Sequence, residues 1–179
     1  MRKLMSGITT WEEARYAVEQ GMDALGFVLE PKSRRYVEPE TAREIILRLP
    51  PLVGTVGVFQ DTPRYTIQEL TTFCRLDWLL FLGNESPKEC RGYFQPIIKL
   101  LPDFHRHVDY TEVNAFLIDD RKELKAGGQA ERSCYFLVPG TSFQEQVPGA
   151  FGLYFLLDTG GTVHESSLSG LGLPETGSI

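Results

Sequence analysis

Apolar and polar positions alternate along the first half of the chain in a way that predicts strands followed by helices. Unbroken apolar runs are typical of strands buried on both faces of a parallel sheet. They alternate with stretches whose apolar residues recur at helical spacing. We expect strands at Lys3–Ser6, Ala24–Leu29, Leu52–Phe59 and Trp78–Leu82. We expect helices at Thr10–Gln20, Glu38–Leu49, Thr62–Arg75 and Ser86–Phe94. This order predicts right-handed βαβ units around a parallel sheet.

The second half keeps the strand-like runs but has few helical stretches. Strands are expected at Pro96–Leu101, Ala115–Ile118, Tyr135–Val138 and Leu153–Leu157. Short helical patterns occur only at Tyr110–Asn114, Ser142–Val147 and Glu165–Leu168, and Lys122–Gly128 is typical of a loop. Eight strand candidates favour a closed barrel of parallel strands over an open sheet. The 179 residues fall below the roughly 200 at which such barrels usually begin. We therefore expect an α/β protein, a reduced (β/α)8 TIM barrel with helices shortened or missing in the second half, as one domain over residues 1–179.

Composition narrows the classes of partner and compartment. With 18 Lys and Arg against 24 Asp and Glu, the net charge is −6, which argues against binding a nucleic-acid backbone. No apolar run approaches the roughly 18 residues of a membrane span, and the N-terminal segment reaches Gly7 too soon for a signal peptide. The cysteines, Cys74, Cys90 and Cys134, are odd in number and widely spaced, as suits a reducing compartment. We expect a cytoplasmic protein with no membrane or nucleic-acid partner.

Polar residues follow most of the predicted strands, where barrel enzymes carry their chemistry. They are Ser6, Arg35, Asp61, Asn84, Asp103, Asp119, Asp120, Asp158 and Thr159. Glycines also follow strands, at Gly127-Gly128, Pro139-Gly140 and Gly160-Gly161, and can let backbone N–H groups approach a phosphate. Each of these residues also has a structural explanation, because Asp, Asn, Ser and Gly start turns and cap helices.

A metal site is the weakest hypothesis from the residues. His105 and His107 alternate along one segment, and His164 is a candidate third ligand for a metal-dependent hydrolase. No helical spacing and no nearby cysteine supports them. We expect no metal and no other cofactor.

Three segments together resemble a known family. They are Ser6-Gly7-Ile8-Thr9, the run from Gly26 to Val37, and Val56-Gly57-Val58-Phe59. They are similar to the signatures of phosphoribosylanthranilate isomerases, which are small (β/α)8 barrels of tryptophan biosynthesis. The resemblance is strong over the first 60 residues, weaker at Leu82–Glu85, and returns at Leu117–Asp119.

The resemblance implies an Amadori rearrangement of an aminoaldose phosphate, with a phosphosugar-anthranilate as the ligand and no cofactor. In the family an Asp is the general acid and a Cys is the base, both of which need matched pKa values. By position, Asp119 matches the acid, Ser6 falls where the base stands, and Arg35 matches an arginine near the substrate's anionic end. Gly128, Gly140 and Gly160 fall where the family binds phosphate.

The departures from the family pattern weaken the expected reaction. Ser6 replaces the family's Cys, and a hydroxyl supplies essentially no anion at neutral pH unless a base activates it. Leu4 stands where the family has Lys, Phe81-Leu82 where it has Gln-His, and Glu131 where it has Lys. Asp158 adds a carboxylate near the expected phosphate site. Two hypotheses follow: an isomerase with weak or lost activity, or an inactive paralogue that serves as a ligand-binding or protein-interaction module.

The thin helical content of the second half predicts an uncovered flank. We interpret two predicted strands, Ile97–Leu101 and Ala115–Ile118, as apolar without a break. If no helix covers them, their outer face is an exposed apolar surface, which favours association. We expect a second copy in a homodimer to cover it. The alternative is cover from the same chain, by 122–132 or by Phe104, Val108 and Tyr110. The exposure of four side chains tests this: Ile98, Leu100, Phe116 and Ile118.

Overall fold

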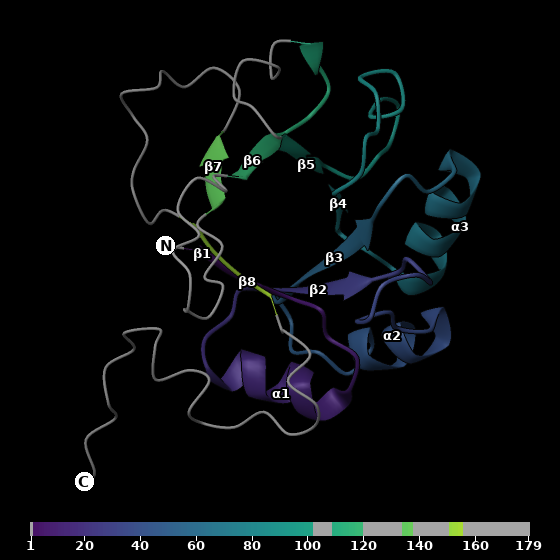
Figure 1. Cartoon of the computed structure of the whole chain (residues 1–179). Coiled ribbons are helices and arrows are strands. Elements are labelled where there is room, and N and C mark those ends of the chain that lie inside the picture. The colour runs from purple at the N-terminus through teal and green to yellow at the C-terminus, as the bar shows by residue number, and fades with distance from the viewer. Residues whose placement is uncertain (1, 102–108, 120–133, 138–150, 156–179) are drawn as a thin grey trace, which may run out of the picture.

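The computed structural model describes residues 2–101, 109–119, 134–137 and 151–155, and these form one curved sheet with three helices outside it (Figure 1). The strands are β1 (Arg2–Ser6), β2 (Ala24–Val28), β3 (Gly54–Phe59), β4 (Trp78–Phe81), β5 (Ile97–Leu101), β6 (Ala115–Asp119), β7 (Cys134–Leu137) and β8 (Phe151–Phe155). Their order in the sheet is β7-β6-β5-β4-β3-β2-β1-β8. Strands β1 to β6 run parallel, and β8 pairs in parallel with β1. The reduced barrel expected from the sequence is therefore confirmed.

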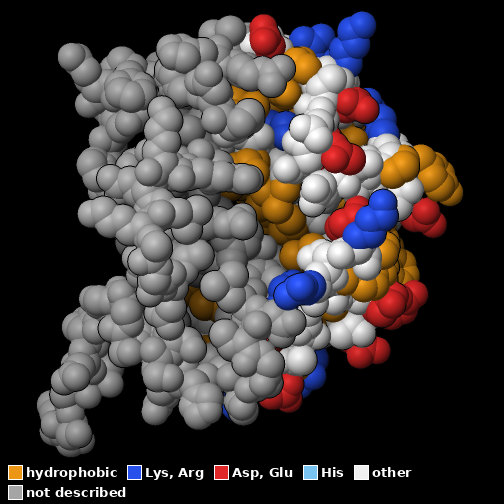
Figure 2. Space-filling view, in the orientation of Figure 1, with side chains coloured by type: hydrophobic (Ala, Val, Ile, Leu, Met, Phe, Trp, Pro, Cys, Tyr) orange, Lys and Arg blue, Asp and Glu red, His pale blue; other side chains and the backbone are white. Residues whose placement is uncertain are grey.

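Alternate strand residues build two separate apolar layers, because successive side chains of a strand point to opposite faces. One layer fills the inside of the barrel and includes Leu4, Val58, Leu80, Ile98 and Leu117. The other lies outside the strands, where Leu25, Phe27, Phe59, Phe81 and Phe116 are buried together with helix residues. Figure 2 shows apolar side chains at the centre of the described half, with charged and some further apolar side chains along its outer margin.

The helices cover the outer face of the first strands. They are α1 (Trp11–Glu19), α2 (Pro39–Ile46) and α3 (Arg64–Cys74). Helix α1 begins with a capping box, in which the Thr10 hydroxyl accepts from Glu13 N and the Glu13 side chain accepts from the Thr10 backbone. Helix α2 begins with Pro39, whose missing N–H is not needed at that position. Each helix was predicted by the sequence pattern, with ends shifted by one to three residues.

Three expectations about the chain after β4 are wrong. Strand β7 pairs antiparallel with β6, from Phe116 opposite Leu137 to Asp119 opposite Cys134. Residues 86–94 form turns rather than a helix, and Gly92 has a φ of +68° there. Residues 110–114 also form a turn. The other two short helices, 142–147 and 165–168, lie outside the described residues.

The barrel is not closed by a hydrogen-bonded ladder within the described strands. Strands β7 and β8 stand at the two ends of the sheet order, and their Cα atoms come within 8 Å of each other. The antiparallel direction of β7 has a physical reason. A parallel return needs a crossover connection, usually a helix, and the sequence between β6 and β7 has no helical pattern.

Strands β5 and β6 are covered by side chains of the same chain, as far as the described residues show. Ile98 faces the barrel interior, Leu100 packs partly buried against that interior layer, and Phe116 is fully buried on the outside. The Tyr110 ring packs edge-on against Phe116, with centroids 6.2 Å apart. The Ile118 side chain, the loop 122–132, Phe104 and Val108 lie outside the described residues. The alternative of cover from the same chain therefore holds for Phe116.

Within the ranges that the structure describes, no helix is long and apolar enough to cross a bilayer.

Candidate active site

The predicted site residues that the structure describes lie at one end of the barrel. Ser6 is the last residue of β1 and Asp119 is the last residue of β6. Because β1 to β6 are parallel, these strands end on the same side of the sheet. Arg35 lies in the loop after β2 and contacts Gly7, the residue that follows β1.

Ser6 is buried, and its hydroxyl is unsatisfied. The residue has no exposed surface, and its Oγ has no hydrogen-bond partner among the described residues. Ser6 pairs with Gly26 in the neighbouring strand. A Cβ on Gly26 would lie 2.8 Å from the Ser6 Oγ, so the hydroxyl needs a glycine beneath it. An orphaned buried hydroxyl is unusual, because burial without a hydrogen bond costs free energy.

Two nitrogens of the Arg35 guanidinium, Nε and Nη2, are held by hydrogen bonds. Its Nε donates to the Gly7 carbonyl oxygen at 2.9 Å, and its Nη2 donates to the same oxygen at 2.6 Å. Nη2 also donates to Glu13 Oε1 at 2.6 Å. Gly7 has a φ of +93°, a conformation that glycine adopts without strain. The residue that ends β1 is thus followed by a turn that Arg35 braces.

Glu13 is ionised in this arrangement. Burial raises the pKa of its carboxyl group, but hydrogen bonds from Arg35 and Thr9, together with the charge of Arg35, outweigh burial and lower the pKa below its usual 4.5. Glu13 and Arg35 therefore form an ion pair at neutral pH, with side chains 15% and 23% exposed.

The expected phosphate-binding glycines, Gly128, Gly140 and Gly160, lie outside the described residues, and so do Glu131 and Asp158. The direction of β7 still bears on them. Leu137, the last residue of β7, lies opposite Phe116, the second residue of β6. The C-terminal end of β7 is therefore at the opposite end of the sheet from Ser6 and Asp119, and the expectation that all eight strands end at one mouth is wrong.

Two departures from the family pattern take different places in the barrel. Leu4 lies in the interior layer and is 5% exposed. Phe81 lies on the outer side, fully buried, and its ring packs against Phe59 and Tyr93 at 6.3 and 5.7 Å between centroids. Leu82, the other half of that departure, packs against the interior layer, so Leu4 and Leu82 both make the inside of the barrel less polar.

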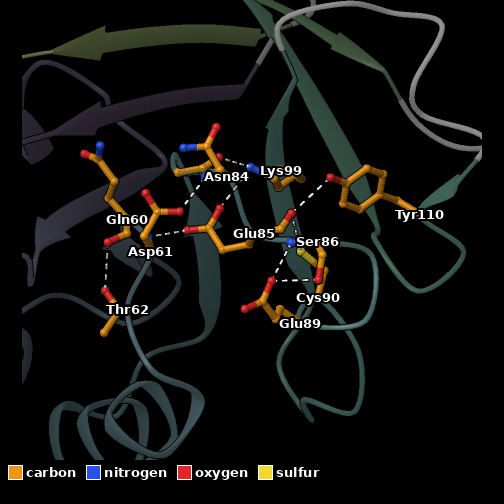
Figure 3. A network of polar contacts seen from close by, with 11 residues as sticks. Gln60, Asp61, Thr62, Asn84, Glu85, Ser86, Glu89, Cys90, Lys99 and Tyr110 are labelled. Atoms are coloured by element: carbon orange, nitrogen blue, oxygen red, sulfur yellow. Dashed lines mark hydrogen bonds and ion pairs between the residues drawn. The ribbon is translucent and has the colours of Figure 1, made fainter.

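A second polar cluster lies beyond the ends of β3 and β4 (Figure 3). Lys99 Nζ donates to Glu85 Oε2 at 3.0 Å and to the Gly83 carbonyl oxygen at 2.6 Å. Glu85 Oε1 accepts from Asp61 N at 2.8 Å, and the Tyr110 hydroxyl donates to the Glu85 carbonyl oxygen at 3.0 Å. Lys99 and Glu85 are 2% and 5% exposed, so this is a buried ion pair.

A pocket of about 340 Å³ borders this cluster, but its charges do not suit an anionic ligand. Its walls include the carboxylates of Asp61, Glu85 and Glu89. Among the described residues of its wall, the cation is Arg64, which donates to the Gly92 carbonyl oxygen and lies 4.9 Å from the centre of the Tyr93 ring. The cluster joins the loops outside β4 and β5, which is a structural role.

Sequence reasoning missed both ion pairs. Lys99 interrupts a run that was read as wholly apolar, and a lysine inside a buried strand signals a buried partner. Glu13 lies three residues after Thr10, the capping-box spacing, which indicates a helix start but not a contact with Arg35.

The structure does not test the metal hypothesis, because His105, His107 and His164 lie outside the described residues. Within those residues, no group of three His, Cys, Asp or Glu side chains is arranged to hold a metal ion.

The parallel βα units, the barrel interior and the polar strand ends define a TIM-barrel protein of the kind that carries its site at the C-terminal ends of the strands. Residues 4–144 match the family described as N-(5'phosphoribosyl)anthranilate (PRA) isomerase. The chain belongs to this family.

Individual relatives agree. The N-(5'-phosphoribosyl)anthranilate isomerase of Moorella thermoacetica is 42% identical over 147 residues, which are 79% of this chain and 66% of the relative. The isomerase of Desulfitobacterium hafniense strain Y51 is 39% identical over 145 residues, 81% of this chain and 54% of the relative. The chain thus spans about half to two-thirds of the length of these relatives.

Solved structures show the same fold. The phosphoribosyl anthranilate isomerase of Thermus thermophilus has a TM-score of 0.63 at 40% identity, over 66% of this chain and 62% of its own. A phosphoribosyl anthranilate isomerase in complex with reduced 1-(o-carboxyphenylamino)-1-deoxyribulose 5-phosphate (rCdRP) has a TM-score of 0.62 at 36% identity, over 66% of this chain and 64% of its own. Monomers generated from the dimeric enzyme of Thermotoga maritima have a TM-score of 0.61 at 34% identity, over 66% and 63%.

Proposed function

We propose that this protein binds the substrate of phosphoribosylanthranilate isomerase but rearranges it slowly or not at all. The family supports the binding part, and the observation that carries the low activity is the Ser6 hydroxyl. A serine needs an adjacent general base before it can take a proton, and no described group accepts a hydrogen bond from Ser6.

The other roles follow the family pattern. Asp119, at the end of β6, is proposed as the general acid that protonates the ribose ring oxygen. Arg35 is proposed to meet an anionic group of the substrate, and Gly128 and Gly160 to contact the phosphate. The reaction needs no cofactor, since it only moves protons within one molecule.

An isomerase assay on the purified protein tests this function. The protein should be made in a host without its own isomerase, beside Asp119→Asn as a control for contamination. We expect a turnover at least about 10²-fold below the usual enzyme range of roughly 1–10³ per second, because a positioned base contributes about 10²–10⁴-fold. Turnover within that range, lost in Asp119→Asn, would overturn the proposed inactivity and reveal a substitute base.

Ser6→Cys is the matched variant. A thiol supplies some thiolate near neutral pH, so a small gain is expected. Recovery should stay incomplete, because Leu4 keeps the barrel interior apolar. Full recovery from this single change would show that the base alone limits the reaction.

The second candidate is an inactive paralogue that keeps only ligand binding or protein interaction. The observation that favours it is Arg35, which remains fixed at the mouth by Gly7 and Glu13 although the base is lost. Calorimetric titration with rCdRP separates the readings. Binding without turnover supports a ligand-binding module, and no binding by a folded protein leaves only an interaction role.

A homodimer is also proposed, because a relative is described as dimeric. Large apolar side chains stand exposed near the N-terminal ends of three adjacent strands, Leu52 before β3, Trp78 at the start of β4 and Phe94 before β5. Exposed apolar groups of this kind mark association surfaces. Light scattering at micromolar concentration tests the dimer, and the triple change to Ser at these positions should yield a monomer.

The cytoplasm remains the proposed compartment. Cys74 and Cys90 are free buried thiols, as suits a reducing environment.

A further inference from the structure

Glu13 connects the start of α1 to the arginine at the barrel mouth. Its Oε2 accepts from Thr9 N at 2.8 Å, from the Thr9 hydroxyl at 3.0 Å and from Thr10 N at 3.3 Å. These bonds fix one carboxylate oxygen in the capping box. The other oxygen, Oε1, is left for Arg35 Nη2 at 2.6 Å.

Arg35 is constrained from two directions by this contact and by Gly7. A guanidinium carries five N–H donors in one plane. Nε and Nη2 are taken up by the Gly7 oxygen and by Glu13. Nη1 has no hydrogen-bond partner among the described residues, so it is the nitrogen left for a ligand.

We propose that Glu13 is a positioning residue, which holds the Arg35 guanidinium in one orientation so that Nη1 meets the anionic group of the ligand. This inference rests on the proposed function for the ligand, but the Glu13–Arg35 clamp itself does not. The clamp makes Arg35 bind end-on through one nitrogen, rather than as the two-nitrogen fork that arginine often presents to carboxylates.

Two opposite effects follow from removing Glu13, and the structure favours one. Loss of its negative charge would strengthen the attraction of Arg35 for an anion. Loss of the clamp would release a long side chain whose rotamer freedom must then be removed on binding. Without Glu13, the bonds that the described residues still offer the guanidinium are those to the Gly7 oxygen, and we expect the loss of positioning to be the larger effect.

Calorimetric titration with rCdRP measures the consequence. Glu13→Ala should weaken binding by about tenfold, corresponding to about 1.4 kcal/mol. Glu13→Gln, which keeps an oxygen acceptor for Arg35, should recover part of this loss. Glu12→Gln removes the same charge from the same helix turn, where the residue is exposed, and should bind as the wild type does.

A second variant separates positioning from helix stability. Thr10→Ala removes the cap hydroxyl that accepts from Glu13 N at 3.2 Å but leaves the contact with Arg35. It should lower the melting temperature and leave rCdRP affinity unchanged at 25 °C, where the protein remains folded. An equal loss of affinity in Thr10→Ala and Glu13→Ala would overturn the positioning role.

A measurement without ligand keeps this inference separate from the proposed function. The Arg35 Nη2 protons, which are bonded to Gly7 and Glu13, should give a slowly exchanging side-chain signal in a nitrogen–proton NMR spectrum, identified by its loss in Arg35→Lys. The signal should weaken or vanish in Glu13→Ala and persist in Glu12→Gln. If it persists unchanged in Glu13→Ala, the clamp is wrong. If the clamp signal behaves as expected but the wild type fails to bind rCdRP, the proposed function fails instead.

Discussion

The two sides of the barrel cover their strands by different means. Strands β1, β2 and β3 are each followed by a helix, and Ala14, Ala42 and Ile67 bury their outer faces. Between β4 and β5 the chain forms turns only, yet Phe81 and Ile97 are as deeply buried as their counterparts in the first half.

The difference shows what a loop needs in order to replace a helix. A helix satisfies its own backbone groups, but a loop packed against a sheet must find other partners for them. Here Lys99 supplies one such partner, for the Gly83 oxygen, and Glu85 ties the loop to the neighbouring one after β3 by accepting from Asp61 N. Tyr93 and Tyr110 supply the apolar cover that helix side chains give elsewhere.

The largest expected effect comes from breaking the buried ion pair. Lys99→Met leaves the Glu85 carboxylate buried without its charge partner and should lower the free energy of unfolding by about 3–5 kcal/mol. Urea denaturation measures it. Adding Glu85→Gln should restore much of the loss, since the amide still accepts from Asp61 N. Arg15→Ala, which breaks the exposed Arg15–Glu19 pair, is the control and should change stability by less than about 1 kcal/mol. Equal losses from the two ion pairs would contradict the structural role of Lys99.

A smaller loss of stability is expected from changes in the half of the barrel that α1, α2 and α3 cover. Thr10→Ala removes the cap of α1 and should cost about 1 kcal/mol, within a range of roughly 0.5–2 kcal/mol. Glu38 precedes α2 and makes no capping bond, so Glu38→Ala should change stability by less than about 0.5 kcal/mol. Thermal unfolding of both variants tests whether capping matters in this half.

The corresponding stability test for the side of the barrel that loops cover, around β4 and β5, is Tyr110→Phe. It removes the hydroxyl that donates to the Glu85 carbonyl oxygen and should cost about 0.5–1.5 kcal/mol. Tyr65→Phe is the control, because Tyr65 is 75% exposed on α3. If Tyr110→Phe is as neutral as Tyr65→Phe, the hydroxyl of Tyr110 adds nothing to the packing of its ring.

The smallest effect is a dependence on pH. Because the pKa of Glu13 is lowered in the folded protein, its ionised form stabilises the fold fully above the unfolded value of about 4.5. This contribution is lost as the pH falls through the lower, folded value. Glu13→Gln should therefore flatten the acid side of the stability curve below about pH 4.5, whereas Glu12→Gln should leave the contribution of Glu13 intact. Unfolding measured from pH 3 to pH 7 provides the test.

The sequence predicted the first half well because local patterns decide it. The run Ala24–Leu29 and the helical spacing in 62–75 require no distant partner to be recognised. Local patterns were insufficient at 86–94, where the interval between Cys90 and Tyr93 fits a helix but Pro87 and Gly92 lie in a turned chain. The direction of β7 was missed for a similar reason, because alternation of apolar residues indicates a strand but not its orientation.

The sequence predicted where the candidate site residues lie in the fold, but not which side chains they contact. Ser6, Arg35 and Asp119 were identified from motifs, and the parallel strands bring the ends of β1 and β6 to one side. No local pattern shows that Glu13 reaches Arg35 across 22 residues of sequence. That Ser6 Oγ has no hydrogen-bond partner among the described residues is equally hidden from the sequence, since it depends on every neighbour inside the barrel.

The pairing of β1 with β8 delays folding during synthesis. Ser6 lies opposite Phe155, so one edge of the first strand lacks its partner until the last strand has been made. At about 5–20 residues per second, this interval is on the order of 7–30 s. Throughout it, β1 has only β2 beside it, and its free edge is a template for pairing with other nascent chains. Chains released at intermediate lengths should therefore aggregate until β8 is included, and a chaperone that shields this edge should raise the yield of folded protein.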